Sequence, residues 1–236
     1  FAGSASEANE WKNAVSNAEE SAKNWAETKA TLEASQEATM GLMQSVIELS
    51  GQENKSAAQK EQLKATVDQL NTSVEGLNLS YDEETDTLNM SSEALENYIK
   101  TMMLQQKAEA IIDQMVEKEK NRYELEQQLA DAQDDLEEAQ KATNEAIENG
   151  TASYDDMHSR EVAAQIKYDE IKESLDGVNA EYEDLEGQYN SITDDIDECN
   201  ASMDDATGST EDLGEATGIT ADEMENWSEE MQDAHD

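Results

Sequence analysis

Residues 164–203 read AQIKYDEIKESLDGVNAEYEDLEGQYNSITDDIDECNASM, and their apolar side chains recur at alternating steps of four and three. A mean step of about 3.5 residues puts these side chains on one stripe of an α-helix, and that stripe must be buried against another helix. The pattern therefore predicts a long helix with at least one partner helix. We call this stripe the seam; it consists of Ala164, Tyr168, Ile171, Leu175, Val178, Tyr182, Leu185, Tyr189, Ile192, Ile196, Cys199 and Met203.

A second long helix is predicted upstream, from residue 91 or 92 to about residue 148, because a serine at either position can cap its start. It repeats apolar or small residues at the spacing of the seam. These are Leu125, Leu129, Ala132, Leu136, Ala139, Thr143 and Ala146.

Asn149-Gly150 follows this helix and is typical of a helix end and a turn. Folding back near 149–152 would place Ala164 opposite residue 138 and Met203 opposite residue 99. We therefore expect a mainly α protein in which residues 91–206 form an antiparallel helical hairpin of coiled-coil type. The alternative is one continuous rod that pairs with other chains.

The N-terminal part is predicted to hold two further helices. Residues 1–50 contain one long helix, in which Trp11 and Trp25 share a face and Gly51 is a stop signal. Ser56 and Gln59 have the spacing of a capping box, which predicts the start of a short helix that runs to about residue 74. This short helix opens a segment, residues 56–90, that ends in a different pattern.

Residues 77–81 and 87–90 alternate apolar and polar side chains on either side of an acidic loop. Alternation with a period of two around a short polar loop predicts a small β-hairpin. Because an isolated hairpin is marginally stable in water, it should lean on the flanking helices. Its buried face would consist of Leu77, Leu79, Tyr81, Leu88 and Met90.

The C-terminal part is predicted to be a linker followed by a short helix. Residues 207–219 contain three glycines among Thr, Ser and acidic residues, which is typical of a flexible linker. Thr220 and Glu223 then form a capping-box pattern, so residues 220–236 are expected to hold a short helix. The chain begins with phenylalanine rather than methionine, which is typical of an excised or processed piece.

The composition limits the possible partners. The chain has 58 acidic and 15 basic residues and a formal net charge of -43, which excludes nucleic-acid binding because phosphate contact needs a basic surface. The acidity is interpreted as strong solvation of helix surfaces, with adaptation to high salt or complementarity to a basic partner as alternatives.

No stretch approaches the roughly 18 apolar residues of a membrane span.

No pattern predicts catalysis, a cofactor or a zinc site, so the chain is expected not to be an enzyme. Its two histidines lie apart in polar surroundings, and its paired carboxylates are too many to be distinctive. The acids of residues 82–86 with Glu93 fit an EF-hand count, but Thr87 stands where a glycine is needed. Weak cation binding by residues 193–198 and 204–205 stays an open alternative. Cys199 is interpreted as a small buried hydrophobe rather than a redox group.

Residues 64–98 read KATVDQLNTSVEGLNLSYDEETDTLNMSSEALENY, and this stretch resembles a segment of phage tail tape measure proteins. The specific part is LNLS followed directly by YDEETDTLNMSSEAL. The flanking heptads fit that family but occur in many unrelated proteins. The resemblance implies a structural protein of phage or phage tail-like particles, with a Gram-positive host for the particle.

The same resemblance implies a role and partners. Tape measure proteins lie extended in the tail tube, set its length during assembly, and are ejected into the host envelope at infection. The chain would then self-associate, by family analogy as a trimer, and contact tube and distal tail proteins in the virion tail or in the host cytoplasm during assembly. The alternatives are an acidic coiled-coil surface or adhesin-like binding module and a cytosolic helical scaffold.

Overall fold

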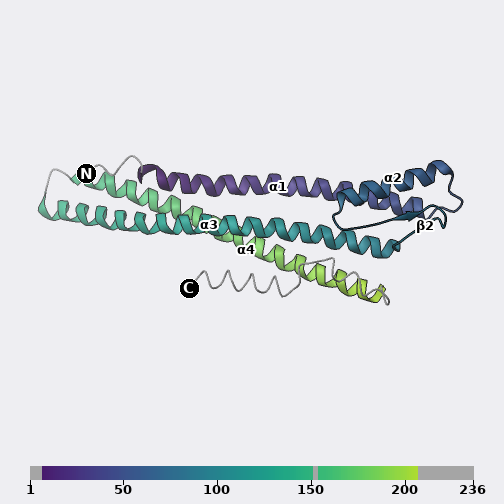
Figure 1. Cartoon of the computed structure of the whole chain (residues 1–236). Coiled ribbons are helices and arrows are strands. Elements are labelled where there is room, and N and C mark those ends of the chain that lie inside the picture. Colours follow the sequence, from purple (N-terminus) through teal and green to yellow (C-terminus); the bar gives the residue numbers. More distant parts are fainter. Residues whose placement is uncertain (1–6, 151–153, 207–236) are drawn as a thin grey trace. The chain divides into compact units, whose positions relative to one another are not determined.

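The structure, a computed structural model, describes residues 7–150 and 154–206 (Figure 1). This part of the chain is mainly helical and contains one two-stranded antiparallel sheet, which confirms the predicted fold class. The predicted linker 207–219 and the helix within 220–236 lie outside the described residues. The elements are α1 (Glu7–Ser50), α2 (Ala57–Ser73), β1 (Tyr81–Asp82), β2 (Thr87–Leu88), α3 (Ser92–Asn149) and α4 (Tyr154–Ala206).

The chain divides into two compact units. Among the described residues, the first unit takes residues 7–36 together with Met103–Ile196, and the second takes Glu37–Met102 together with residues 197–206. Each of α1, α3 and α4 therefore contributes residues to both units.

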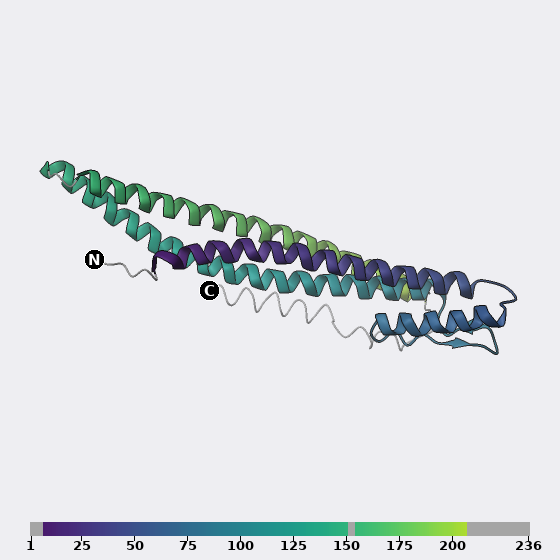
Figure 2. The ribbon, with the colours of Figure 1, turned by 90° about the horizontal axis from the view of Figure 1, so that it is seen from above.

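In the first unit, α3 and α4 form an antiparallel hairpin, and both views show them leaving their shared end side by side (Figure 1, Figure 2). Asp135 Oδ2 accepts a hydrogen bond from Lys167 Nζ at 2.9 Å, and the Arg122 guanidinium lies 5.5 Å from the ring centre of Tyr182. As the residue number rises along α3, the partner's number on α4 falls. The pair Asp135–Lys167 has the register that was predicted for Ala164 and residue 138.

Helix α3 ends where the glycine of the predicted turn stands. Gly150 has φ of 62°, a left-handed conformation that costs glycine little, and its N–H donates to the Ile147 carbonyl at 3.2 Å. The predicted contact of Met203 with residue 99 falls on a side chain outside the described ones.

The N-terminal half of α1 is a third helix of the first unit, which the sequence did not assign to the hairpin. Gln36 Nε2 donates to the Met103 carbonyl at 2.8 Å, and Ala14 shares a hydrophobic cluster with Leu125. Rising numbers on α1 thus meet falling numbers on α3, so α1 runs antiparallel to α3 and parallel to α4. Burying one apolar stripe per helix among three helices gives this unit its core.

In the second unit, α2 begins with the predicted capping box. The Gln59 backbone N–H donates to Ser56 Oγ at 3.3 Å, and the Ser56 N–H donates to Gln59 Oε1 at 2.9 Å. The apolar face of α2, which includes Leu63, Val67 and Leu70, is buried. The same unit holds the sheet, in which Tyr81 pairs with Leu88 and Asp82 pairs with Thr87.

The two strands are shorter than the alternating runs 77–81 and 87–90. The side chain of Asn71 on α2 forms hydrogen bonds with both backbone polar groups of Leu79. Its Oδ1 accepts from the Leu79 N–H at 2.9 Å, and its Nδ2 donates to the Leu79 carbonyl at 2.7 Å. Asn78 is left-handed, with φ of 47°. The helix thus replaces a neighbouring strand as the hydrogen-bonding partner, and the sheet covers two residue pairs only.

We expect that Leu185→Asp lowers the free energy of unfolding by about 3 kcal/mol, because it places a charge without a partner in the helical core. Leu185 is 2% exposed. The control is Asn190→Asp, which adds the same charge at an exposed position of α4. Thermal unfolding followed by circular dichroism compares the two variants, and equal melting temperatures would show that the seam is wrongly placed.

Candidate functional site

The first unit is built around the contact of the seam with α1 and α3. The structure buries Ile171, Val178 and Leu185 and half-buries Tyr168 and Leu175. The other described seam residues are also buried or half-buried: Ala164, Tyr182, Tyr189, Ile192, Ile196 and Cys199. The cluster at the three-helix contact contains Ala14 and Ala18 of α1, Leu125 and Ala132 of α3, and Ile171 and Val178 of α4, with Trp11, Val15, Leu129, Tyr168 and Leu175 packed against it.

A polar layer interrupts the apolar core of this unit. Lys118 on α3 is 1% exposed, and its Nζ forms an ion pair with Glu181 of α4 without meeting the geometry of a hydrogen bond. Within the described part of the chain, Ser21 Oγ, Gln114 Oε1 and Asn121 Nδ2 are also buried and have no hydrogen-bond partner. Buried polar atoms of this kind cost free energy, so this layer lowers stability.

Sequence reasoning did not single out Lys118, although a signal for it exists. Counting the seam's spacing along α3 from Ile111 through Met115 to Leu125 passes through residue 118. A lysine at a core position of a coiled coil specifies register at a cost in stability. The neighbouring Tyr182 is half-buried, and burial together with the charge of Glu119 raises the pKa of its hydroxyl.

The β-hairpin is fastened to the helices of the second unit by lysines. Lys55, with a side chain that is 2% exposed, donates from Nζ to the carbonyls of Ser50 and Gln52 at 2.8 Å each, and its Nζ lies 3.1 Å from Asp86 Oδ1. This places a cation at the C-terminal end of α1, where it is favoured. Lys64 on α2 donates to Glu83 Oε1 at 2.9 Å.

The structure places the predicted hairpin face against these helices. Leu77 and Leu79 are buried, while Tyr81, Leu88 and Met90 are half-buried. The Tyr81 hydroxyl donates to Asp86 Oδ1 at 2.6 Å. Partial burial and this hydrogen bond raise the pKa of Tyr81 to about 12, and the bond from Tyr81 with the nearby Lys55 lowers the pKa of Asp86.

Asp82 and Asp86 of the hairpin loop are bound by donors from the protein itself. Asp82 Oδ1 accepts from the backbone N–H groups of Glu84 and Thr85 at 2.8 and 3.2 Å, which closes an Asx turn. Asp86 is held by Tyr81 and Lys55. Among residues 7–150 and 154–206, no group of three or more histidine, cysteine, aspartate or glutamate side chains is arranged to hold a metal ion.

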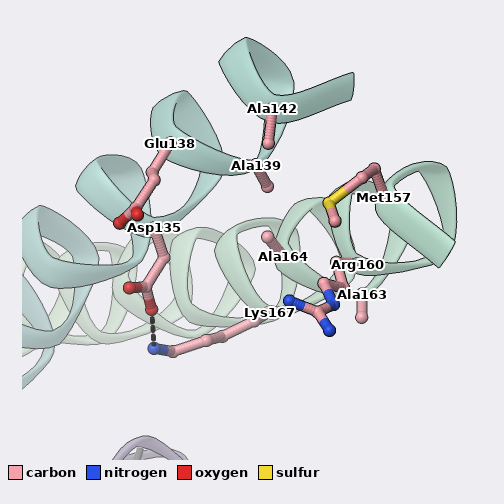
Figure 3. A pocket seen from close by; sticks show the side chains of 9 residues that line it. All are labelled: Asp135, Glu138, Ala139, Ala142, Met157, Arg160, Ala163, Ala164 and Lys167. Carbon is pink, nitrogen blue, oxygen red and sulfur yellow. Dashed lines mark hydrogen bonds and ion pairs between the residues drawn. The ribbon is translucent and has the colours of Figure 1, made fainter. Parts of the chain in front are cut away.

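Near their shared turn, α3 and α4 enclose a shallow groove, which we call the tip groove (Figure 3). Small side chains line its floor, and an ion pair between Asp135 and Lys167 crosses from one helix to the other. The rim on α3 is acidic and the rim on α4 is basic. The lining residues are Asp135, Glu138, Ala139 and Ala142 of α3 and Met157, Arg160, Ala163, Ala164 and Lys167 of α4.

Comparison of the chain with models of protein families, with curated proteins and with solved structures finds no match. None of the described helices is both long enough and apolar enough to cross a membrane.

We expect the two members of the buried ion pair to respond differently to substitution. Glu181→Gln should lower the free energy of unfolding by about 1–3 kcal/mol, discounted for the partly exposed carboxylate, because it leaves Lys118 charged and buried. Lys118→Met should be neutral or stabilising, because it removes the buried charge. Chemical denaturation measures both, with Glu183→Gln as a control for charge loss at an exposed site. Equal effects of the two glutamine variants would contradict a role for the pair.

We expect Asp86→Asn to destabilise the second unit at neutral pH and to have no effect in acid. Because the folded state lowers the pKa of Asp86, its stabilisation is present above the unfolded value of about 3.9 and is lost as the pH falls through the folded pKa. Hydrogen exchange of residues 77–90 at several pH values measures this difference. Glu84→Gln removes a charge from the same loop at an exposed position and should show no such pH dependence.

Proposed function

We propose that this chain is a structural region of a phage tail tape measure protein, which helps to set tail length during assembly and is ejected at infection. The observation that carries the proposal is the stretch of residues 64–98, which resembles that family. This stretch covers most of α2, the sheet and the start of α3, so the resemblance falls on one folded module of the second unit. A resemblance that spans a module is more specific than one carried by heptads.

The helical architecture supports the same proposal on physical grounds. A helix advances 1.5 Å per residue, so the length of a helical chain is proportional to its number of residues. The helices of the first unit bury narrow apolar stripes and expose acidic faces. Such helices can associate side by side with helices of other chains by burying these stripes. On this proposal the chain has no catalytic function, and its partners are further copies of itself and other tail proteins.

The antiparallel hairpin affects how much length this region would add to a tail whose length is set by the chain. If α3 and α4 stay folded back, residues 103–196 contribute the length of one arm, about 70 Å. If they run end to end inside the tube, the same residues contribute about 140 Å. The proposal accommodates both states, because the seam can be buried against another chain as well as against α3.

We expect an in-frame deletion of residues 103–196 to shorten the tails that assemble, by about 70 Å for the folded hairpin or about 140 Å for the extended chain. Electron microscopy of the particles measures the change. Leu185→Asp keeps the number of residues and disturbs the seam, so it separates loss of length from loss of folding.

Two outcomes would contradict the proposal. Tails of unchanged length would show that residues 103–196 do not contribute to tail length. Antibodies to the chain that label the surface of intact cells and no tail would favour the adhesin-like alternative.

A further inference from the structure

The first unit has a second groove, which lies between α1 and α4 and which we call the α1–α4 groove. Its volume is about 700 Å³, within the roughly 300–1,000 Å³ that is typical of binding clefts. Of the described helices, only α1 and α4 line it, whereas the hydrophobic cluster of this unit also includes α3. The groove is therefore a separate surface from the contact that these two helices make with α3.

The floor of the α1–α4 groove is formed by small and apolar side chains. Ala18 and Val178 are buried, and Val15 and Ala22 are half-buried. Gly177 also lines the groove, and a Cβ added there would meet no atom within 4 Å. Small residues along two neighbouring helices let a further helix come close, and covering this floor would remove apolar surface from water.

The rim of the α1–α4 groove is acidic. Glu181 forms an ion pair with the buried Lys118. The other three rim carboxylates, which belong to Glu19, Glu170 and Glu173, are exposed and form no ion pair with a described residue. Lysine and arginine complement such a groove, because their alkyl stems can lie on an apolar floor while their charges reach the carboxylates.

The charge of this chain disfavours its own segments as occupants. The chain has a formal net charge of -43, and residues 207–236 contain 10 acidic residues and no lysine or arginine. A second copy, or this C-terminal segment, would bring carboxylates to a groove that is already lined by carboxylates. The groove therefore suits a different protein with a basic surface.

We propose that the α1–α4 groove binds a basic amphipathic helix of another protein. The apolar stripe of that helix would cover the floor, and its lysine or arginine side chains would pair with Glu19, Glu170 and Glu173. This binding follows from the groove alone and is independent of the resemblance at residues 64–98.

Calorimetric titration of the full chain with a designed helical peptide tests the proposal. The peptide carries a stripe of alanine and leucine flanked by lysines, and a matched peptide has glutamate in place of every lysine. We expect the lysine peptide to bind with one-to-one stoichiometry, and more weakly as salt is added, because salt screens exposed charges. The glutamate peptide should not bind.

Charge variants locate the binding site. Glu170→Gln combined with Glu173→Gln should weaken binding of the lysine peptide about three- to tenfold, because two exposed ion pairs are lost. Glu183→Gln combined with Glu186→Gln is the matched control, since it removes two exposed charges at the same spacing on α4 outside the groove. It should change the affinity by less than about twofold, because salt screens distant charges.

A third pair of variants fills the groove without removing charge. Gly177→Leu places a side chain in open space, so it should keep the fold and weaken binding of the lysine peptide by about tenfold or more through overpacking. Gly187→Leu is the matched control, because Gly187 is a second α4 glycine with open space around it and lies outside the groove lining. It should bind the peptide like the unmodified chain, and circular dichroism checks that both variants are folded.

Several results would overturn the proposal. These are no binding of the lysine peptide at low salt, equal weakening by the two double glutamine variants, and unchanged binding to Gly177→Leu. Self-association of the free chain that Gly177→Leu abolishes would assign the groove to a second copy instead. Peptide binding that requires removal of residues 207–236 would assign it to that segment.

Discussion

Burial of one apolar stripe per helix is the constraint on which the rest of this protein depends. Hydrophobic residues are only 36% of the chain, so a thick globular core cannot form, whereas narrow stripes can be covered by neighbouring helices. In the first unit α1, α3 and α4 meet in this way, and the seam residues from Ala164 to Ile196 are buried or half-buried there. The acidic faces are left to water, where like charges are solvated and kept apart.

Polar groups work against this burial at defined places. Lys118 and Asn121 occupy space in the core that apolar side chains would fill more favourably, and a buried lysine is tolerated because Glu181 lies beside it. Such a layer favours one alignment of helices over its neighbours in the heptad series, since a shift by one heptad would separate the charges. The alignment that gives the antiparallel hairpin is therefore supported by charge as well as by apolar contact.

The second unit uses a different balance of forces. Its hairpin pairs only two residues on each strand, too few to be stable alone, and it depends on Asn71, Lys55 and Lys64 for contacts with the helices. Three of the chain's 15 basic residues contact this hairpin: Lys55 pairs with Asp86, and Lys60 and Lys64 donate hydrogen bonds to Glu83. Residues 64–98, on which the resemblance to tape measure proteins rests, also lie in this unit. The functional proposal therefore depends on the second unit, whereas the seam accounts for the long helices of the first.

The heptad pattern alone determined that the chain would be mainly helical, where α3 and α4 would turn back, and which face of α4 would be covered, because burial of a stripe depends on local spacing. The capping box at Ser56 and the turn at Gly150 could also be predicted from the sequence, because each depends on a few neighbouring residues. Only the tertiary structure decided that α1 is the third helix, that Lys118 meets Glu181, and that Asn71 ends the strand pairing at Leu79. Those features join residues far apart in the chain, and many partners satisfy the same local pattern until the helices are placed side by side.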